Sequence, residues 1–461
     1  MPSPISPDNA PFDGRWWSPD EQSHVVGGRL ELESDVWHVT LFGWLGPWTG
    51  RSADDVEVPS VIHGQIGITL VSLLDLVPGG WSASANDPPY ETRISANTVI
   101  VGVHATPATR FTQAGVRLVH LNEWAKRRPW SFGSATGGTY TQTVTFTEPA
   151  EETATLTGAT ARLWRSWGQE GGDLSAVTMT SDEWVYFDFE APIDLDTVEH
   201  DWVRPLQNFI ELAAAARSPV VELTVTPEGA DEGTRSASVV SAASRSAPRR
   251  TKQPFQFIFT LDDVVFGDIV PEWWKLHGDV GVVADLVASL RRKGGYVSSQ
   301  FLTGASAIEG YHRHRFGPTK RSQEQKDRIK RIVASASDED QHWLKQQLAF
   351  SHEPSFSNRL DDVVALAGPL FPTAVGDLNA WRKWVKDGRN SVAHRDPSMV
   401  DLDNEWHTTV RVTATIEWLM TLVLLREVGV PDTVIETGVR RNRGLQAATH
   451  HLREARPDWF V

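Results

Sequence analysis

The chain has 461 residues, of which 40% are hydrophobic and 22% are charged, the composition of a folded globular protein rather than a disordered one. A chain of this length does not usually fold around a single hydrophobic core, so we expect two or three domains. The net charge is −15 and cysteine is absent, which excludes disulfides, thiolate metal sites and a cysteine nucleophile.

The first half of the chain is predicted to be rich in strands. Short runs of β-branched and aromatic residues alternate with Gly, Pro, Asn and Asp turns between residue 12 and about residue 230. One helix is expected at 203–216, because Leu206, Phe209, Ile210 and Ala213 fall on one face. The predicted strands are WHVTLFGWL, ITLVSLL, NTVIVGVHA, TYTQTVTFT, EWVYFDFE and PVVELTVTP.

The segment that follows interrupts this pattern. Residues 226–254 are rich in Ser, Ala, Arg and Gly, which predicts a mobile loop. The next run, FQFIFTLDDV, resembles a strand that returns to the first domain. We therefore place the end of the first domain later, within residues 271–282.

The second half is predicted to be helical, with Pro, Gly and Asp at the breaks between helices. The chain is thus expected to be an α+β protein with a β-rich domain at 12–275 and an all-α domain at 276–461. Helices are expected at 282–293, 297–315, 322–335, 339–349, 356–367, 376–395 and 404–428.

Charge is divided unevenly between the two halves. Residues 290–461 carry 25 Lys and Arg against 21 Asp and Glu, whereas residues 1–289 carry 19 against 38. An acidic surface repels nucleic acid, so any contact with RNA is expected in the C-terminal half.

The N-terminus has neither a basic start nor an apolar run, and charges interrupt the most apolar helix. We therefore expect a cytoplasmic protein that does not bind membranes.

The segment with the clearest chemical content is Arg389-Asn390-Ser391-Val392-Ala393-His394. An arginine offers a planar fork of donors to a phosphate, and a histidine moves a proton near neutral pH. An apolar stripe that includes Trp381 and Val385 precedes the motif and would fix it against a core. Asp387-Gly388 suggests a local break, and Asn390 and His394 share a helix face if the helix continues. From spacing alone, an ordinary surface helix with scattered polar residues is the favoured interpretation.

Other polar residues have weaker claims to a functional role. Arg443 and His450 fit the same loose spacing, but no comparable apolar stripe anchors them. Glu309, on an otherwise apolar helix, either supports the cleft or is exposed or capping, and we favour the second interpretation. His312 and His314 have no third ligand at a suitable spacing, so we interpret them as surface histidines rather than a metal site.

The tryptophans of the first strands suggest either a core or a binding surface, because rings on a sheet can fill an interior or stack on a ligand. We favour the core. The residues concerned are Trp16, Trp17, Trp37, Trp44, Trp48 and Trp81.

Several blocks of the sequence resemble blocks of ApeA-type abortive-infection proteins and follow one another in the same order. In those proteins an N-terminal domain precedes a HEPN-type helical domain. Together the blocks cover nearly the whole chain. The blocks are FDGRWWSPD, VVGGRLEL, VIHGQIGITLVSLLD, VIVGVHATPATRFTQAGVRLVHLNEW, WVRPLQNFIELA, PVVELTV, QFLTGASAIEGYHRH and FSNRLDDVVALAG, followed by the Arg389–His394 motif.

This resemblance implies an anti-phage effector that cuts host RNA, with tRNA as one candidate, through a homodimeric HEPN ribonuclease that uses no metal or other cofactor. Arg389 would bind the scissile phosphate, His394 would act as general base or acid, and Asn390 would orient the substrate or hold the histidine. A phage-derived trigger would release the activity. Some HEPN toxins carry a modifiable tyrosine two residues after the histidine. Here Arg395 and Asp396 follow His394, so that form of control is not expected.

Two other classes of function remain open at the level of sequence. The helical domain could serve only as a non-catalytic dimerisation scaffold for an N-terminal ligand- or protein-binding module. A carbohydrate-active enzyme is the weakest alternative, since no pair of carboxylates stands out in a suitable context.

Overall fold

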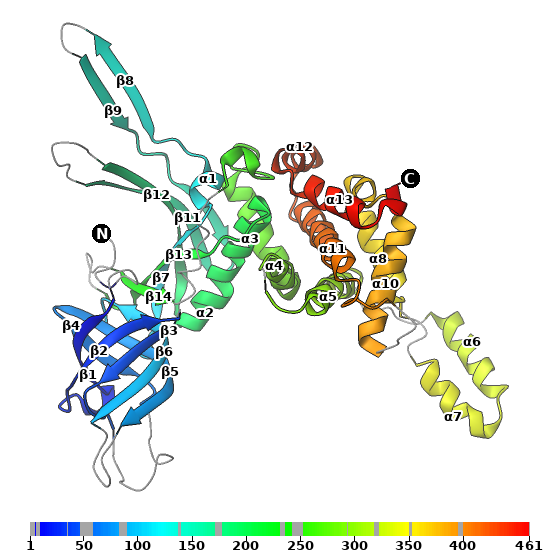
Figure 1. Ribbon diagram of the computed structural model, residues 1–461, viewed down its shortest axis with the longest axis horizontal. Coiled ribbons are helices and arrows are strands. Elements are labelled where there is room, and N and C mark those ends of the chain that lie inside the picture. Colours follow the sequence, from blue (N-terminus) through cyan, green and yellow to red (C-terminus); the bar gives the residue numbers. More distant parts are fainter. Residues whose placement is uncertain are drawn as a thin grey trace. The chain divides into compact units, whose positions relative to one another are not determined.

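The computed structural model divides the chain into two compact units (Figure 1). Unit 1 comprises residues 1–210, 218–252 and 266–271, and unit 2 comprises residues 211–217, 253–265 and 272–461. The structure describes residues 5, 10–34, 36–46, 59–82, 90–136, 140–170, 178–230, 236–241, 252–292, 294–317, 322–349, 353–394 and 400–460.

Unit 1 begins with six antiparallel strands that close into a barrel. Their order is β6-β3-β2-β1-β4-β5, and β5 pairs again with β6, for example Val71 with Val101. The strands are β1 (Phe12–Trp17), β2 (Val26–Glu33), β3 (Val36–Leu41), β4 (Ile62–Ile66), β5 (Thr69–Ser82) and β6 (Glu91–Val101), with a short 3-10 turn η2 (Pro19–Glu21) after β1.

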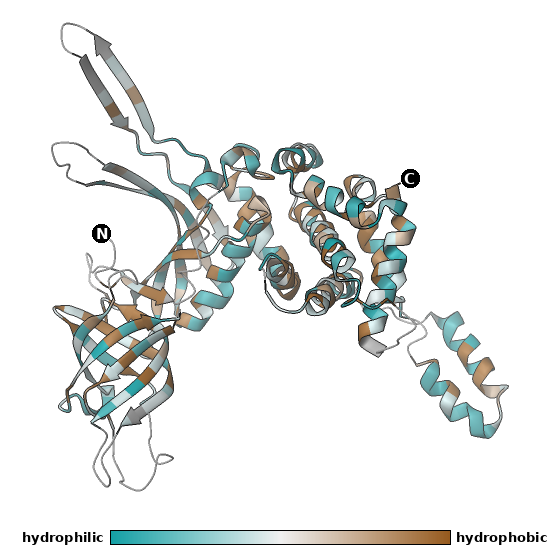
Figure 2. Cartoon of the chain, viewed as in Figure 1, coloured by the Kyte–Doolittle hydropathy of each residue, from teal (hydrophilic) through white to brown (hydrophobic). Residues whose placement is uncertain are grey.

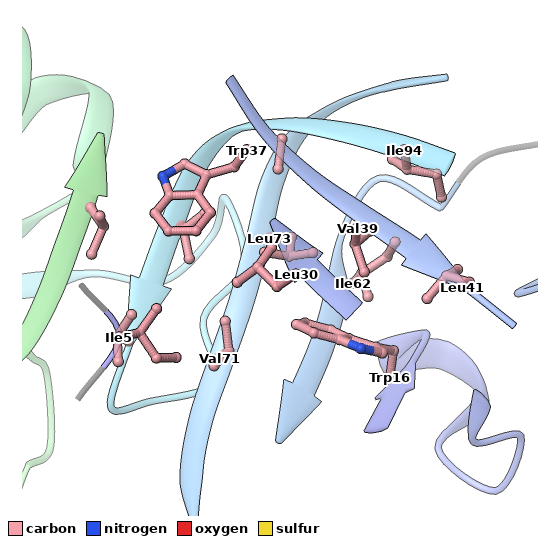
Figure 3. Close-up of a cluster of buried hydrophobic side chains, with 14 of the residues drawn as sticks. Ile5, Trp16, Leu30, Trp37, Val39, Leu41, Ile62, Val71, Leu73 and Ile94 are labelled. Atoms are coloured by element: carbon pink, nitrogen blue, oxygen red, sulfur yellow. The ribbon is translucent and has the colours of Figure 1, made fainter. Parts of the chain in front are cut away.

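The barrel interior is filled by alternate residues of each strand, because successive side chains of a strand point to opposite faces (Figures 2 and 3). Trp16 and Trp37 are both fully buried there. Trp16 stands opposite Val26 on one side and Gly64 on the other. A Cβ atom at Gly64 would lie 2.3 Å from the Trp16 ring, so glycine is required where the ring crosses the neighbouring strand.

The sheet continues beyond the barrel because β6 has two neighbours on one side. Its first half pairs with β3 and its second half with β14. From there the order is β14-β13-β7-β12-β11-β10. These strands are β7 (Phe111–Leu118), β10 (Glu152–Leu156), β11 (Ala159–Glu170), β12 (Thr178–Ile193), β13 (Val220–Pro227) and β14 (Ala237–Ser241).

The remaining elements of this part are short apart from one helix. A separate two-stranded hairpin is formed by β8 (Trp130–Thr136) and β9 (Tyr140–Phe146). Between strands lie α1 (Leu121–Ala125), α2 (Leu195–Thr197), the π-helical turn η4 (Val198–Val203) and α3 (Arg204–Ala214). Helix α3 confirms the helix predicted at 203–216, and its four predicted apolar residues are all buried.

Unit 2 is helical apart from its turns, which confirms the predicted α+β class. Helices α5, α8, α10 and α11 form its centre. The indole N–H of Trp381 in α10 donates to the Thr415 hydroxyl in α11 at 2.9 Å. The elements are η6 (Pro254–Gln256), α4 (Phe266–Leu290, of which residues 266–271 belong to unit 1), α5 (Val297–Phe316), α6 (Gln323–Ala334), α7 (Asp338–Gln347), α8 (Phe356–Leu366), α9 (Leu370–Val375), α10 (Leu378–His394), α11 (Trp406–Glu427), α12 (Asp432–Asn442), α13 (Gly444–Ala455) and η7 (Pro457–Phe460).

Helix α11 is the core helix of unit 2. It is long and apolar enough to cross a membrane, but 78% of its most apolar window is buried in the structure. Its buried residues include Val412, Ile416 and Leu419, one helical turn apart. Packing within the protein therefore accounts for the apolar character of this helix.

Two predictions about the segment after β13 were wrong. Residues 237–241, expected in a mobile loop, form β14, in which Val239 and Val240 are buried and pair with β6. The run FQFIFTLDDV does not form a strand. Phe257, Ile258 and Phe259 are buried consecutively rather than alternately, and the segment belongs to unit 2, where the Ile258 N–H donates to the Ala213 carbonyl at 2.8 Å.

Candidate functional site

Helix α10 carries the Arg389–His394 motif and continues without interruption through Asp387-Gly388. The predicted break at this dipeptide was therefore wrong. A Cβ atom at Gly388 would lie 3.1 Å from the Phe301 ring of α5 and 3.0 Å from Leu402, so this glycine permits close packing rather than a turn. The predicted apolar stripe is confirmed, since Trp381 and Val385 are fully buried.

The Arg389 guanidinium is held by groups from three helices. Its Nη2 lies 3.3 Å from Oε2 of Glu309 on α5, and its Nη1 donates to Oδ1 of Asn390 at 3.4 Å. Its Cζ lies 5.6 Å from the ring centroid of Phe356 on α8, a cation–π distance. The Arg389 side chain keeps 29% of its surface exposed. These contacts orient a guanidinium that solvent still reaches.

The contacts of Arg389 leave it able to bind an anion. A guanidinium has five N–H donors, and the two hydrogen bonds to Glu309 and Asn390 use two of them. Glu309 is itself 23% exposed, so the ion pair is only partly withdrawn from water. A phosphate could therefore join the guanidinium without first displacing a fully buried partner.

The predicted site residues share one helix. Asn390 is partly buried beside Arg389, and His394 is the last residue of α10. Since α10 continues, Asn390 and His394 stand four residues apart on one helix face, as the sequence allowed. The side chain of His394 and all of Arg395 and Asp396 lie outside the described residues, so the structure places only the backbone of His394.

Glu309 has a more specific role than the one we favoured from sequence. It was interpreted as an exposed or capping residue, whereas it pairs with Arg389 across two helices. Phe356 was not identified at all. Both residues lie far from the motif in sequence, and only their place in the blocks AIEGYHRH and FSNRLDDVVALAG connected them to it.

His312 is not a surface histidine, which corrects the sequence interpretation. It is 3% exposed, and its Nε2 lies 2.9 Å from Oδ2 of Asp362 on α8. Its ring also stacks on Phe316 at 4.6 Å. His314 is exposed, as expected. The His312–Asp362 pair therefore links α5 to α8, the two helices that carry Glu309 and Phe356.

The second loosely matching motif has a different environment. Arg443 is exposed at the junction of α12 and α13, and His450 lies 3.3 Å from Glu454 with 67% of its side chain exposed. His450, His451 and Glu454 are the group with metal-ligand spacing found among the described residues, and all three are exposed. These contacts are those of surface ion pairs.

The tryptophans of the barrel are mostly core residues, as we favoured. Trp16, Trp37 and Trp44 are 0%, 0% and 5% exposed, and Trp17 is partly buried. The side chains of Trp48 and Trp81 lie outside the described residues. The rings of Trp16 and Trp37 lie in the barrel core, so they do not form a ligand surface on its outside (Figure 3).

The fold and the site define a class of protein in which a β-rich domain precedes a HEPN-type helical domain. The family model for ApeA N-terminal domain 1 matches residues 11–273, and the model for Apea-like HEPN matches residues 302–434. Because the first match covers more than half of the chain, the protein belongs to the ApeA family, and the resemblance seen in the sequence is confirmed.

The two matches together identify an effector of the abortive-infection, HEPN type, a class of domain that generally has nuclease activity. The HEPN match contains α8, α10 and α11 and most of α5, and therefore includes Glu309, Phe356 and Arg389. Comparison with the curated proteins and with the solved structures gives no match.

Proposed function

We propose that this protein is an anti-phage endoribonuclease in which Arg389, Asn390 and His394 form the catalytic site, acting in the cytoplasm without a metal ion. The observation that carries the proposal is the Arg389 guanidinium, oriented by Glu309, Asn390 and Phe356 yet still partly exposed. Such a preorganised, accessible arginine suits the stabilisation of a phosphate that gains charge in the transition state.

In the proposed reaction, a ribose 2′-hydroxyl attacks the adjacent phosphorus and the bond from phosphorus to the 5′ oxygen breaks. His394 takes the proton from the 2′-hydroxyl or supplies one to the leaving oxygen. Arg389 neutralises the phosphate, and Glu309 acts as a positioning residue for Arg389. The products are a 2′,3′-cyclic phosphate and a 5′-hydroxyl. DNA resists because it lacks the attacking group.

The proposed biological setting is infection. A phage-derived trigger releases the activity, host RNA such as tRNA is cut, and growth stops together with phage replication. We propose a homodimer, or a larger homo-oligomer, as the active form, with the motifs of two protomers facing one cleft. The acidic N-terminal half is then the sensor or regulatory part, and the less acidic C-terminal half meets RNA.

The proposal is tested by single substitutions in phage-challenged cells. Arg389→Ala and His394→Ala are expected to abolish both protection and RNA breakdown while the protein accumulates normally. Arg382→Ala is the matched control for the arginine, because Arg382 lies on the same helix and pairs with Asp361 at 2.8 Å. His450→Ala is the control for the histidine.

The same experiment separates the alternative function. If the HEPN domain were only a scaffold, both motif variants would protect cells as well as the wild type, and the proposal would be wrong. Loss of protection in the Arg382→Ala control as well would point to general damage to α10 rather than to catalysis.

A further inference from the structure

Helices α6 and α7 form a hairpin whose fold is specified locally rather than by a core. Ser322 accepts from the Gln325 N–H at 3.1 Å and its own N–H donates to the Gln325 side chain at 2.9 Å, a reciprocal capping box. Ser337 caps α7 through the Asp340 N–H. Among the residues of both helices only Val333 is buried. This hairpin leaves nearly its whole surface available for binding.

The hairpin contains a groove of about 430 Å³ between its two helices. Lys326 and Lys330 line one side, four residues apart and therefore about 6 Å apart along α6. Lys345 of α7 lines the other side. The groove is completed by Ile329, Val333, Ala334 and Gln341.

The charges of this groove are all of one sign. Its lining contains three ammonium groups and no carboxylate, and none of the three lysines pairs with a carboxylate in the described part of the chain. Like charges four residues apart on a helix repel each other. The acidic residues of α7 lie at its N-terminus, at 338–340, outside the lining. An anion bound in the groove would relieve this repulsion.

We propose that this groove binds the phosphodiester backbone of single-stranded RNA and delivers it to the HEPN site. An extended polyanion fits because the lysines are spread along two helices rather than gathered around one point. In the sequence the hairpin lies between α5 and α8. These two helices carry Glu309 and Phe356, which contact Arg389. The inference rests on the proposed function, because it assigns the RNA contact of that same enzyme.

The test measures RNA binding separately from cleavage. The dissociation constant of the full-length His394→Ala protein for a fluorescein-labelled single-stranded RNA is determined over a range of salt concentrations. The logarithm of the affinity falls linearly as the logarithm of the salt concentration rises, and removing one phosphate contact makes this dependence shallower by about 0.7. We expect Lys326→Gln/Lys330→Gln to make it shallower by about 1.4 and to weaken binding by about 25-fold at 0.1 M salt. Adding Lys345→Gln is expected to make it shallower by about a further 0.7.

The matched control is Arg328→Gln/Arg331→Gln. It removes the same charge from the same helix, but neither arginine lines the groove. An unchanged slope in the lysine variants, or an equal loss in both pairs of variants, would overturn the proposal. Polyglutamate that binds with the same dependence on the lysines would also overturn it, since the groove would then accept any acidic polymer.

Cleavage by the wild-type protein in phage-challenged cells, where the proposed trigger is present, is measured in parallel and distinguishes the two proposals. Cleavage that occurs while the lysine variants bind normally would leave the ribonuclease standing and reject the groove. A lysine-dependent slope with no cleavage would support the groove and reject the ribonuclease.

Discussion

The clearest prediction of stability concerns Glu183, a fully buried carboxylate on β12. It is shared by two arginines: Nε of Arg165 donates to it at 2.8 Å and Nε of Arg127 at 2.9 Å. Arg165 is 6% exposed, and Arg127 keeps 12% of its side chain exposed. Glu183→Gln keeps the size of the side chain but removes the only carboxylate paired with Arg165 among the described residues and leaves Arg127 with Glu152 alone, at 4.0 Å.

Removing one partner of a buried ion pair costs about 3–5 kcal/mol, because the remaining charge stays buried and uncompensated. We expect Glu183→Gln to lower the opening free energy of β11 and β12 by about this amount. Amide exchange in those strands should then be faster by a factor of roughly 150 to 5,000. Hydrogen-exchange mass spectrometry of the full-length protein measures amide exchange separately in each segment. The unfolding of unit 2 therefore does not affect the values measured for β11 and β12.

Glu190→Gln is the control, because Glu190 lies on the same strand and is exposed. It should change exchange by about 0.5 kcal/mol or less. If Glu183→Gln behaves like this control, the reasoning about the buried charge triad is wrong. Faster exchange throughout unit 1, without enrichment in β11 and β12, would also contradict it.

Three further predictions concern other parts of the molecule. Gly64→Ala should destabilise the barrel by about 1–3 kcal/mol in urea titrations, because the new methyl group meets the buried Trp16 ring; an unchanged midpoint would refute this. Burial lowers the pKa of His63, despite a hydrogen bond to the Ala105 carbonyl, and the nearby His104 lowers it further. Below pH of about 6.5 the unfolded chain therefore takes up a proton that the folded chain refuses, so the free energy of unfolding should fall as the pH drops through this range, and less so in His63→Gln. A pH profile of urea midpoints that is identical for both proteins would contradict this assignment. Glu309→Gln should reduce RNA cleavage while leaving α10 helical by circular dichroism, because Arg389 loses its charged partner; full activity in this variant would exclude a positioning role for Glu309.

Local patterns in the sequence were sufficient to predict most individual elements. Alternating strands such as those around Trp37 and Val185, and the apolar stripe of α10, depend on neighbours within a few residues. The closure of the barrel does not, because β5 and β6 pair through a register that no local pattern encodes. Strand β14 was missed because its Ser and Ala residues resemble a loop, and only pairing with β13 and β6 makes it a strand.

The candidate site was predictable in part for the same reason. Arg389, Asn390 and His394 are adjacent in sequence, so their common helix could be predicted. The ion pair of Arg389 with Glu309 joins residues 80 positions apart, and a lone glutamate on an apolar helix is usually exposed. Gly388 was misread because a helical glycine that admits the Phe301 ring looks the same in sequence as a glycine that ends a helix.

The catalytic role of the Arg389–His394 motif is tested most directly by sequencing the RNA ends formed in phage-challenged cells. Wild-type, Arg389→Ala and His394→Ala proteins are compared, with total RNA captured through 5′-hydroxyl and 2′,3′-cyclic phosphate ends. New paired ends of both kinds are expected at discrete sites in the wild type and in neither variant. Ends that carry 5′-phosphates, or the same ends in all three strains, would contradict the proposed catalytic role of the Arg389–His394 motif.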